Sequence, residues 1–300
     1  MLNTSGPSLA AGLWRVYAVS RPYSSAYLAL CCLCGLLGGS RLASTKELLL
    51  AVFLVPAFTL AAAALNDLAH WQADQQAGRS RSFARPFLLS LGVSFMIVTL
   101  SLAALAGRNT LWWMLASLAL GIFYGLVKRV PLLANVIRGT TSAALVLASG
   151  AMSGLNSSVA QLALGVGLLD AAGNIWGDLR DEHSDRAVGF RTIAVVSERA
   201  AVAAALLLQG GASWALTSAA PEVLPLSLFG PAITIIAPRR QAHLWFLVLK
   251  YATLGVVAME LAKDWRALTL AAVLWLLAIP SLLAYQRLHP STVARRTSLS

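Results

Sequence analysis

The sequence contains few charged residues and very few acids. Asp and Glu together supply 12 of 300 residues, and all charged residues make up only 12%. Hydrophobic residues account for 58% of the chain, and the mean hydropathy is +0.72. This composition excludes a soluble globular protein. Apolar runs of roughly 17–22 residues, the length that crosses a bilayer, recur from end to end instead.

Cysteine is also scarce. The three cysteines lie together in the first apolar run, at Cys31, Cys32 and Cys34. A C-C-x-C pattern without a neighbouring His or acid is poor spacing for a metal site, so we predict simple apolar packing. The glycines that follow, Gly35, Gly38 and Gly39, are predicted to be helix-contact residues.

The apolar runs predict an all-α, polytopic membrane helical bundle of nine or ten transmembrane helices. The chain shows no long linker and no soluble domain, so we expect one integral-membrane domain over 1–300, with short cytoplasmic tails at 1–18 and 289–300. A cleaved signal peptide is not expected, because the first run lacks a cleavage site and further spans follow. The predicted spans are 20–39, 47–66, 87–107, 111–127, 132–153, 158–177, 198–217, 223–237, 243–262 and 267–285. The run at 223–237 is short and rich in proline, which leaves nine and ten both open.

The net charge of +11 could suggest a nucleic-acid partner, but its distribution argues against one. With ten alternating spans, sixteen Lys and Arg residues fall on one side of the membrane, five on the other and two inside spans, which accounts for all 23. The positive-inside rule makes the basic side cytoplasmic. Part of the basic excess therefore encodes topology, and part can serve an anionic ligand.

Half of the acids lie in two short segments on that same side. One holds Asp67 and Asp74, and the other holds Asp178, Asp181, Glu182 and Asp185. Residues three, four and seven apart share a helix face, so each cluster is predicted to point in one direction. Clustered carboxylates repel one another, and they need a solvated surface, basic partners or a bound metal.

The two segments form an internal repeat. Asp67, His70, Asp74 and Gly78 have offsets of 0, 3, 7 and 11, and the same offsets recur 111 residues later at Asp178, Asp181, Asp185 and Gly189. Each set follows an apolar span and ends at a Gly suited to a left-handed helix cap. Arginines then follow, with Arg79, Arg81 and Arg85 after the first set and Arg191 after the second. This pattern predicts two similar helical halves that face one another.

Two carboxylate-bearing helix ends ringed by arginines suit a metal-bridged polyanion. Mg²⁺ commonly binds through one or two carboxylates together with substrate phosphates, and Arg donates to phosphate oxygens in a forked geometry. At the mouth of an apolar bundle, the matching ligand is a diphosphate with a hydrocarbon tail. The alternative is that these are ordinary juxtamembrane loops, but such loops do not explain paired Asp sets in a chain with twelve acids.

Several further residues have two interpretations. Tyr124 and Trp176 could line the chamber or belong to the aromatic belt at the membrane interface. Lys128 and Arg129 could contact diphosphate or determine topology. His183 is predicted to be a solvated loop residue.

These residues resemble the motifs of the UbiA superfamily of intramembrane prenyltransferases. The first motif of that family is matched by Asn66, Asp67, His70, Asp74, Arg79 and Arg85-Pro86. The second is matched by Asp178, Asp181, Asp185, Arg186, Gly189 and Thr192, and the segment between the fourth and fifth spans by Tyr124, Lys128, Arg129, Pro131 and Asn135. The resemblance covers about residues 18–262 in order and spacing.

The resemblance implies a Mg²⁺-dependent active site on the cytoplasmic side of a multi-pass membrane protein. The metal ligands it implies are Asn66, Asp74, Asp181 and Asp185. We assign catalytic roles to Asp67, Asp178 and Tyr124, and substrate contacts to Arg79, Arg81, Arg85, Lys128, Arg129, His70, Asn174 and Arg186. The implied partners are a prenyl diphosphate, an aromatic acceptor and membrane lipids, with no nucleic acid.

The sequence departs from the family pattern at two points. His70 stands where the family has the middle Asp of its first motif, which removes a hard oxygen ligand that Mg²⁺ prefers. Arg85-Pro86 runs into FLLSLGVSF, where the family has a small Ser-Gly loop on the acceptor side. An enzyme that no longer receives the usual quinone-ring precursor could tolerate both changes.

Three functions remain open on the sequence alone. The leading hypothesis is a prenyltransferase that ionises a prenyl diphosphate and transfers the chain to a small aromatic acceptor, with release of pyrophosphate. In a terpene cyclase of the same superfamily, a double bond of the substrate would capture the cation instead. A transporter or binding protein for an anionic lipid would bind without releasing pyrophosphate.

Overall fold

The computed structural model describes residues 22–69, 71, 83–127, 130–187, 189–237 and 239–288, and these residues form helices and turns without a strand. All ten predicted apolar runs coincide with a helix. The helices are α2 (Pro22–Leu37), α3 (Thr45–Ala69), α5 (Arg85–Ala106), α6 (Arg108–Val127), α7 (Leu133–Ser153), α8 (Ser157–Ala187), α10 (Glu198–Ala219), α11 (Leu224–Ile236), α12 (Arg239–Leu261) and α13 (Trp265–Leu288), with the short α9 (Ile193–Val196) and a 3₁₀ turn η1 (Pro221–Val223).

Six of these helices are long and apolar enough to cross a membrane: α3, α5, α6, α8, α10 and, from residue 241 on, α12. The protein is therefore an all-helical bundle with several candidate spans. The count of nine or ten spans stays a prediction, because α2, α7, α11 and α13 do not meet the same length and hydropathy in the described residues.

Local sequence signals set several helix ends. Pro86 lies in the first turn of α5, where its missing N–H leaves no hydrogen bond unmade. The Thr192 side chain accepts a hydrogen bond from Val195 N at the start of α9, and Ser197 does the same for Ala200 N at the start of α10. Helices α9 and α10 therefore begin directly after residues that favour the N-cap position.

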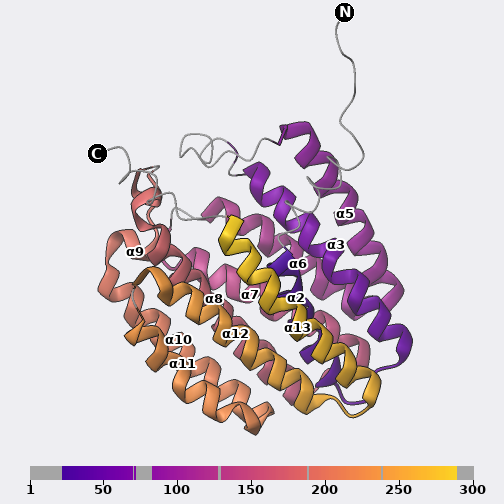
Figure 1. Ribbon diagram of the computed structural model, residues 1–300. Helices are drawn as coiled ribbons and strands as arrows, with labels where there is room; N and C mark the ends of the chain where they lie inside the picture. The colour runs from indigo at the N-terminus through magenta and orange to yellow at the C-terminus, as the bar shows by residue number, and fades with distance from the viewer. Residues whose placement is uncertain are drawn as a thin grey trace, which may run out of the picture.

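Consecutive long helices run antiparallel, so the C-terminal ends of α3 and α8 reach the same end of the bundle (Figure 1). The starts of α5 and α7 lie at that end too. This end, which we call the acidic end, carries both motif helices, and the turns after α2 and α7 lie at the opposite end. The fold thus places the C-terminal ends of α3 and α8, where Asp67 and Asp178 lie 111 residues apart in the sequence, at the same end of the bundle.

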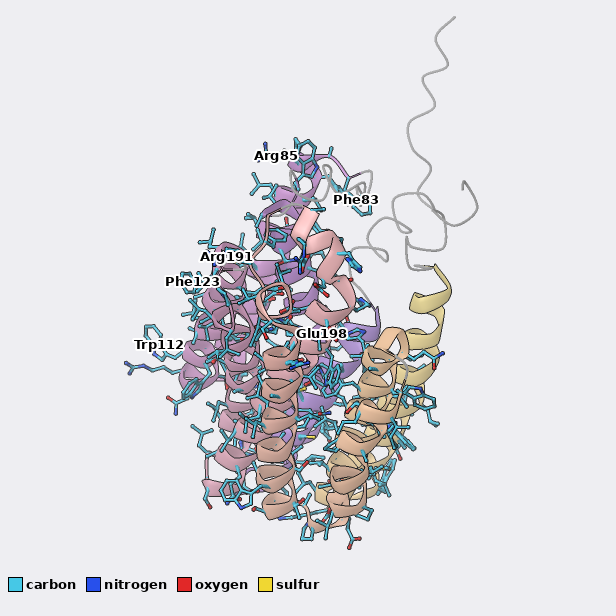
Figure 2. All side chains as sticks on the ribbon, turned by 90° about the vertical axis from the view of Figure 1, so that its left-hand side faces the viewer. Phe83, Arg85, Trp112, Phe123, Arg191 and Glu198 are labelled. Atoms are coloured by element: carbon cyan, nitrogen blue, oxygen red, sulfur yellow. The ribbon has the colours of Figure 1, made fainter. Side chains whose placement is uncertain are left out.

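Helix α8 lies centrally among its neighbours and packs against α7, α10 and α12, while α2 packs against α7, α3, α12 and α13. Large apolar side chains also cover the outside, as Trp112 and Phe123 of α6 show in Figure 2, with Leu126 of the same helix 71% exposed. Soluble proteins rarely expose apolar surface on this scale. An outer surface of this kind suits contact with lipid.

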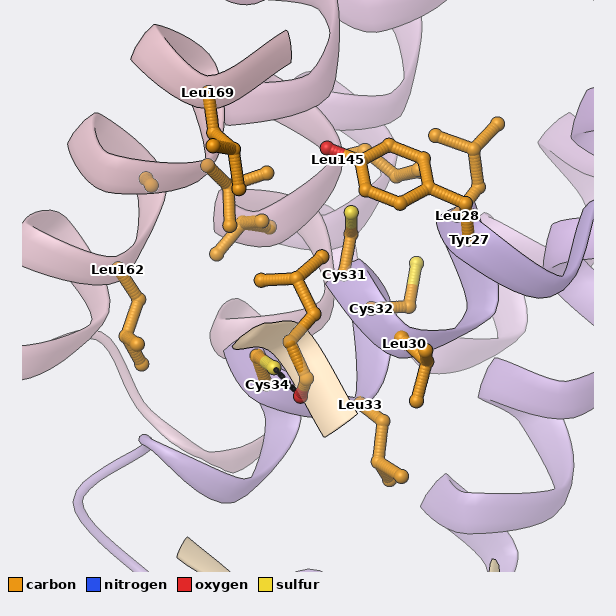
Figure 3. Close-up of a cluster of buried hydrophobic side chains, with 14 of the residues drawn as sticks. Tyr27, Leu28, Leu30, Cys31, Cys32, Leu33, Cys34, Leu145, Leu162 and Leu169 are labelled. Carbon is orange, nitrogen blue, oxygen red and sulfur yellow. Dashed lines mark hydrogen bonds between the residues drawn. The ribbon is translucent and has the colours of Figure 1, made fainter. Parts of the chain in front are cut away.

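The interior around α2 confirms the predictions for its cysteines and glycines. All three cysteines are buried among Leu, Val and Tyr side chains, and Cys34 Sγ lies 3.7 Å from the carbonyl oxygen of Leu254 (Figure 3). A Cβ added to Gly35 would lie 2.3 Å from the carbonyl oxygen of Val146. Only Gly permits α2 and α7 to approach so closely.

Candidate active site

The first acidic segment begins in the last turn of α3. Asp67 is buried with 9% exposure, and the side-chain oxygen Oδ1 of Asn66 is buried and accepts no hydrogen bond. Buried polar atoms in proteins nearly always have a partner, so an unpartnered oxygen needs an explanation. A bound cation or ligand at this helix end would supply one.

Helix α5 begins beside this end of α3. The indole nitrogen of Trp71 donates to the carbonyl oxygen of Phe83 at 3.3 Å, and the Arg85 guanidinium lies over the Trp71 ring, 5.2 Å from its centroid. Arg85 is exposed and lies at the acidic end (Figure 2). The structure thus places one of the predicted diphosphate-binding arginines next to the α3 motif.

The second acidic segment is a continuous part of α8, as its spacing predicts. Asp178 is 7% exposed, and its Oδ2 accepts a 2.9 Å hydrogen bond from Nδ2 of Asn135 on α7. One turn earlier, Oδ1 of Asn174 accepts from the Tyr124 hydroxyl of α6 at 3.1 Å, while its Nδ2 is buried without a hydrogen bond. These two bonds tie α6 and α7 to the motif face of α8.

Asp181 lies further along α8 and forms an ion pair with Arg180, its neighbour in the sequence. The Arg180 guanidinium donates to both carboxylate oxygens, at 2.9 and 2.7 Å, and a third nitrogen of Arg180 lies 3.1 Å from Nδ1 of His243 on α12. The Asp181 side chain remains 35% exposed. It is therefore accessible at the acidic end, and α12 contributes a polar residue to its surroundings.

Asp185 and Arg186 stand in the last turn of α8 and differ in burial. Asp185 is 1% exposed, whereas the Arg186 side chain is 61% exposed and pairs with Glu182 at 2.7 Å. The helix then ends at Gly189, whose φ of +75° confirms the predicted left-handed cap. Phe190 N donates to Asp185 O and Gly189 N to Arg186 O, the bonding pattern of a Schellman motif.

The structure brings together part of the predicted site. Asn66, Asp67 and Arg85 gather near the end of α3, and Tyr124, Asn174, Asp178, Asp181, Asp185 and Arg186 lie on or against the second half of α8. The remaining predicted site residues, His70, Asp74, Arg79, Arg81, Lys128 and Arg129, lie outside the described residues. Within the described part of the chain, no three His, Cys, Asp or Glu side chains are grouped closely enough to hold a metal ion.

The structure corrects the interpretation of His183 in part and distinguishes between the two interpretations of Trp176. His183 is exposed as predicted, but it belongs to α8 and not to a loop, because the helix continues ten residues past the apolar run. Trp176 is 6% exposed and packs in the interior, which excludes the interface-belt interpretation.

Several polar residues for which the sequence predicts no role in the site have polar partners in the structure. Asn135 matches a family motif and contacts Asp178, and Asp170, Arg138 and Lys250 form a charged cluster within the bundle. The sequence does mark the three charged residues as candidates, because ionisable residues within apolar spans are functional candidates by default. That they pair with one another could not be predicted, because they lie on three different helices.

The model of the UbiA prenyltransferase family matches residues 27–240. The chain belongs to this family. Members of the UbiA family are prenyltransferases. A comparison with curated protein sequences finds no match.

Solved structures share the UbiA fold with this chain. A UbiA homologue from Aeropyrum pernix K1 is 17% identical with a TM-score of 0.60, covering 88% of this chain and 98% of that one. A UbiA homologue from Archaeoglobus fulgidus, bound to GPP and Mg²⁺, is 14% identical with a TM-score of 0.61, covering 90% and 98%. A digeranylgeranylglyceryl phosphate synthase structure is 18% identical with a TM-score of 0.58, covering 91% and 96%.

Proposed function

We propose that this protein is a Mg²⁺-dependent intramembrane prenyltransferase. It ionises a prenyl diphosphate and transfers the isoprenoid chain to a small aromatic acceptor, with release of pyrophosphate. The observation that carries the proposal is the location of two helix ends with acidic residues, those of α3 and α8, at the same end of an apolar helical bundle. The Archaeoglobus homologue bound to GPP and Mg²⁺ supports the same ligand class.

The donor set fits Mg²⁺. The metal prefers oxygen ligands, and the ligands that we assign, Asn66, Asp74, Asp181 and Asp185, offer only oxygen. The Oδ1 atom of Asn66 is buried without a hydrogen bond, as expected of an oxygen kept for a cation. Mg²⁺ commonly binds through one or two carboxylates and completes its coordination with substrate phosphate oxygens and water, which suits this donor set. When bound, Mg²⁺ neutralises the diphosphate and stabilises its departure.

The remaining site residues have distinct tasks. Arg85, beside the α3 motif, donates to diphosphate oxygens, together with Arg79, Arg81, Lys128 and Arg129. Asn135 holds Asp178 in place, so that this carboxylate orients water or ligand at the metal. Tyr124 donates a hydrogen bond to Asn174, one turn before Asp178, so its aromatic ring is close enough to the motif to stabilise positive charge there.

The architecture supports chemistry away from water. The bundle crosses the membrane nine or ten times as a single domain over residues 1–300, with the acidic end on the cytoplasmic side, where the basic loops fall. A prenyl diphosphate then enters with its charged group at the cytoplasmic interface and its chain in the apolar interior.

The function is tested with purified protein in detergent, Mg²⁺ and prenyl diphosphates from dimethylallyl to geranylgeranyl. Pyrophosphate release is followed with and without an aromatic acceptor, and products are identified by mass. Release that depends on the acceptor supports the transferase. Release of a cyclic hydrocarbon or alcohol without acceptor would make the protein a cyclase, and tight binding without release under all conditions would favour an anionic-lipid binding protein or transporter.

The control for this assay is Asp181→Ala, because Asp181 is partly exposed and its loss leaves no cavity in the core. We expect at least a hundredfold loss of kcat/KM with unchanged yield and unchanged elution from size-exclusion chromatography. Full activity in Asp181→Ala would contradict the assignment of Asp181 as a metal ligand.

A further inference from the structure

A charged cluster lies in the interior of the bundle, below the acidic end. Asp170 of α8 is 3% exposed, and its carboxylate pairs with the Lys250 ammonium of α12. The Arg138 Nε of α7 lies 3.1 Å from Asp170 Oδ2, and the Ser142 hydroxyl of the same helix donates to that oxygen. Two cations and one anion thus meet within the bundle, where the Asp170 and Lys250 side chains are almost fully buried and the Arg138 side chain is 33% exposed.

Lys250 extends the cluster to a fourth helix. The side chain of Lys250 is 6% exposed, and its ammonium lies 3.6 Å from the centroid of the Tyr27 ring of α2. Tyr27 packs edge-on against Tyr251, with the ring centroids 5.5 Å apart. Helices α2, α7, α8 and α12 therefore converge on these charges, and each pair of neighbours among them is in contact.

The cluster lies on the same helix faces as the candidate active site. Asp170, Asn174 and Asp178 are four residues apart along α8, so they share one face. On α7, Asn135 contacts Asp178, whereas Arg138, one turn further in, contacts Asp170. The eight residues between Asp178 and Asp170 correspond to about 12 Å along the helix axis.

Two features block a path along the α7–α8 face at this level, whereas a small cavity that borders Lys250 lies between α8, α10, α11 and α12. Ionised groups in a membrane interior are costly to separate or to strip of their partners, so an apolar chain cannot displace them. The α7 and α8 backbones also approach closely here, since a Cβ added to Gly139 would lie 2.4 Å from the carbonyl oxygen of Gly167. A hydrocarbon chain that enters from the acidic end and follows α8 meets the charges, and it cannot pass between α7 and α8 beneath them.

We propose that the Asp170–Lys250–Arg138 cluster forms the floor of the prenyl chamber and restricts the substrate to dimethylallyl and geranyl diphosphates. An isoprene unit contributes four chain carbons with bonds of about 1.5 Å, so it extends about 5 Å, and two units reach about 10 Å. A chain of three or four units would reach past Asp170. The inference rests on the proposed function, because it takes the diphosphate to lie at the acidic end.

The test compares the apparent Kd of geranyl and geranylgeranyl diphosphates in Mg²⁺, measured by thermal stabilisation of the purified protein in one detergent. For the wild type we expect geranyl diphosphate to bind at least tenfold more tightly. In Asp170→Asn/Lys250→Ala, which removes one charge of each sign and opens space, the ratio of the two Kd values should shift at least tenfold toward the longer chain. Partition of the ligands into micelles cancels in this comparison between proteins.

The matched control is Leu254→Ala, one turn further along α12 from Lys250 and fully buried. It also loosens α12 but lies beyond the floor, so the chain-length preference should stay that of the wild type. The proposal is overturned if the wild type binds both ligands equally well, a result that needs no variant to fold, or if the double variant keeps the wild-type ratio. If no prenyl diphosphate stabilises any of the proteins, the proposed function itself fails, and the inference fails with it.

Discussion

At the residue scale, the buried amide of Asn135 is the contact that most directly supports the α8 motif. It is 1% exposed and donates to Asp178 across the α7–α8 interface. A buried carboxylate that loses a hydrogen-bond donor is destabilised, and its position becomes less defined. Asn135 therefore acts on the site through Asp178, as a positioning residue.

Replacement of Asn135 by Ala should lower both stability and activity. We expect the loss of this charge-assisted hydrogen bond to cost about 1–3 kcal/mol, and kcat/KM to fall while Asn135→Gln, which keeps an amide, recovers part of the loss. Prenyl transfer and thermal unfolding in detergent measure the two effects. Thr140→Ala on the same helix is the control, since that exposed hydroxyl bonds only to the backbone of its own helix. An Asn135→Ala variant as active as Thr140→Ala would refute the positioning role.

His70 lies outside the described residues, and its role is still predicted from the sequence. It stands where the family motif has an Asp, a harder ligand for Mg²⁺. We expect His70→Asp to hold or raise the apparent Mg²⁺ affinity, measured from the metal dependence of pyrophosphate release. A fall of tenfold or more, about 1.4 kcal/mol, would instead show a specific role for the histidine.

At the element scale, α8 is the helix that organises the molecule. It continues from the membrane interior through the second acidic segment without a break, and it ends in the Schellman motif at Gly189. The continuous helix fixes Asp170, Asn174 and Asp178 on one face. One element thus carries two of the predicted metal ligands, Asp181 and Asp185, near its end and Asp170 of the charged cluster in its middle.

The end of α8 can be tested with two glycines that have open space around the position of an added Cβ. A Cβ at Gly189 would meet nothing within 4 Å, so Gly189→Ala introduces only the strain of a left-handed conformation, about 1–2 kcal/mol. Gly210, within α10, is equally open, and Gly210→Ala should stabilise by about 0.5–1 kcal/mol because Ala favours a helix. Thermal unfolding should therefore shift in opposite directions for the two variants. Equal shifts would mean that the cap at Gly189 is not in place.

At the scale of the whole molecule, the acidic end and the opposite end must face different compartments. Arg191 follows α8 at the acidic end, and Lys263 lies in the connection between α12 and α13 at the other end; both are accessible to solvent. The three native cysteines are buried, so an impermeant thiol reagent has no other accessible target among the described residues.

We expect Lys263→Cys to react with an impermeant maleimide in intact cells, and Arg191→Cys to react only after the membrane is opened. The physical reason is the positive-inside rule, which retains the basic loops in the cytoplasm. Labelling followed by a gel shift measures both. The reverse pattern would place the site on the outer face while leaving the bundle itself unchanged.

The positions of the helices along the chain could be predicted from the sequence, because a segment that crosses a bilayer needs a long apolar run. Each predicted run coincides with a helix, and the Gly cap at Gly189 follows from a local conformational rule. The spacing of the acids also predicts the helical continuation to Asp185, and only the assignment of His183 to a loop is wrong, because a polar segment carries no apolar period that would separate a helix from a loop.

The helical class, the two acidic segments and the family motifs can be recognised in the sequence alone, since these depend on composition and on spacing along one chain. Which polar side chains meet is known only from the packing of the helices. The pairing of Asn135 with Asp178, of Tyr124 with Asn174, and of Asp170 with Lys250 joins residues 43 to 80 positions apart. Such contacts depend on how whole helices pack, and no local pattern in the sequence records that arrangement.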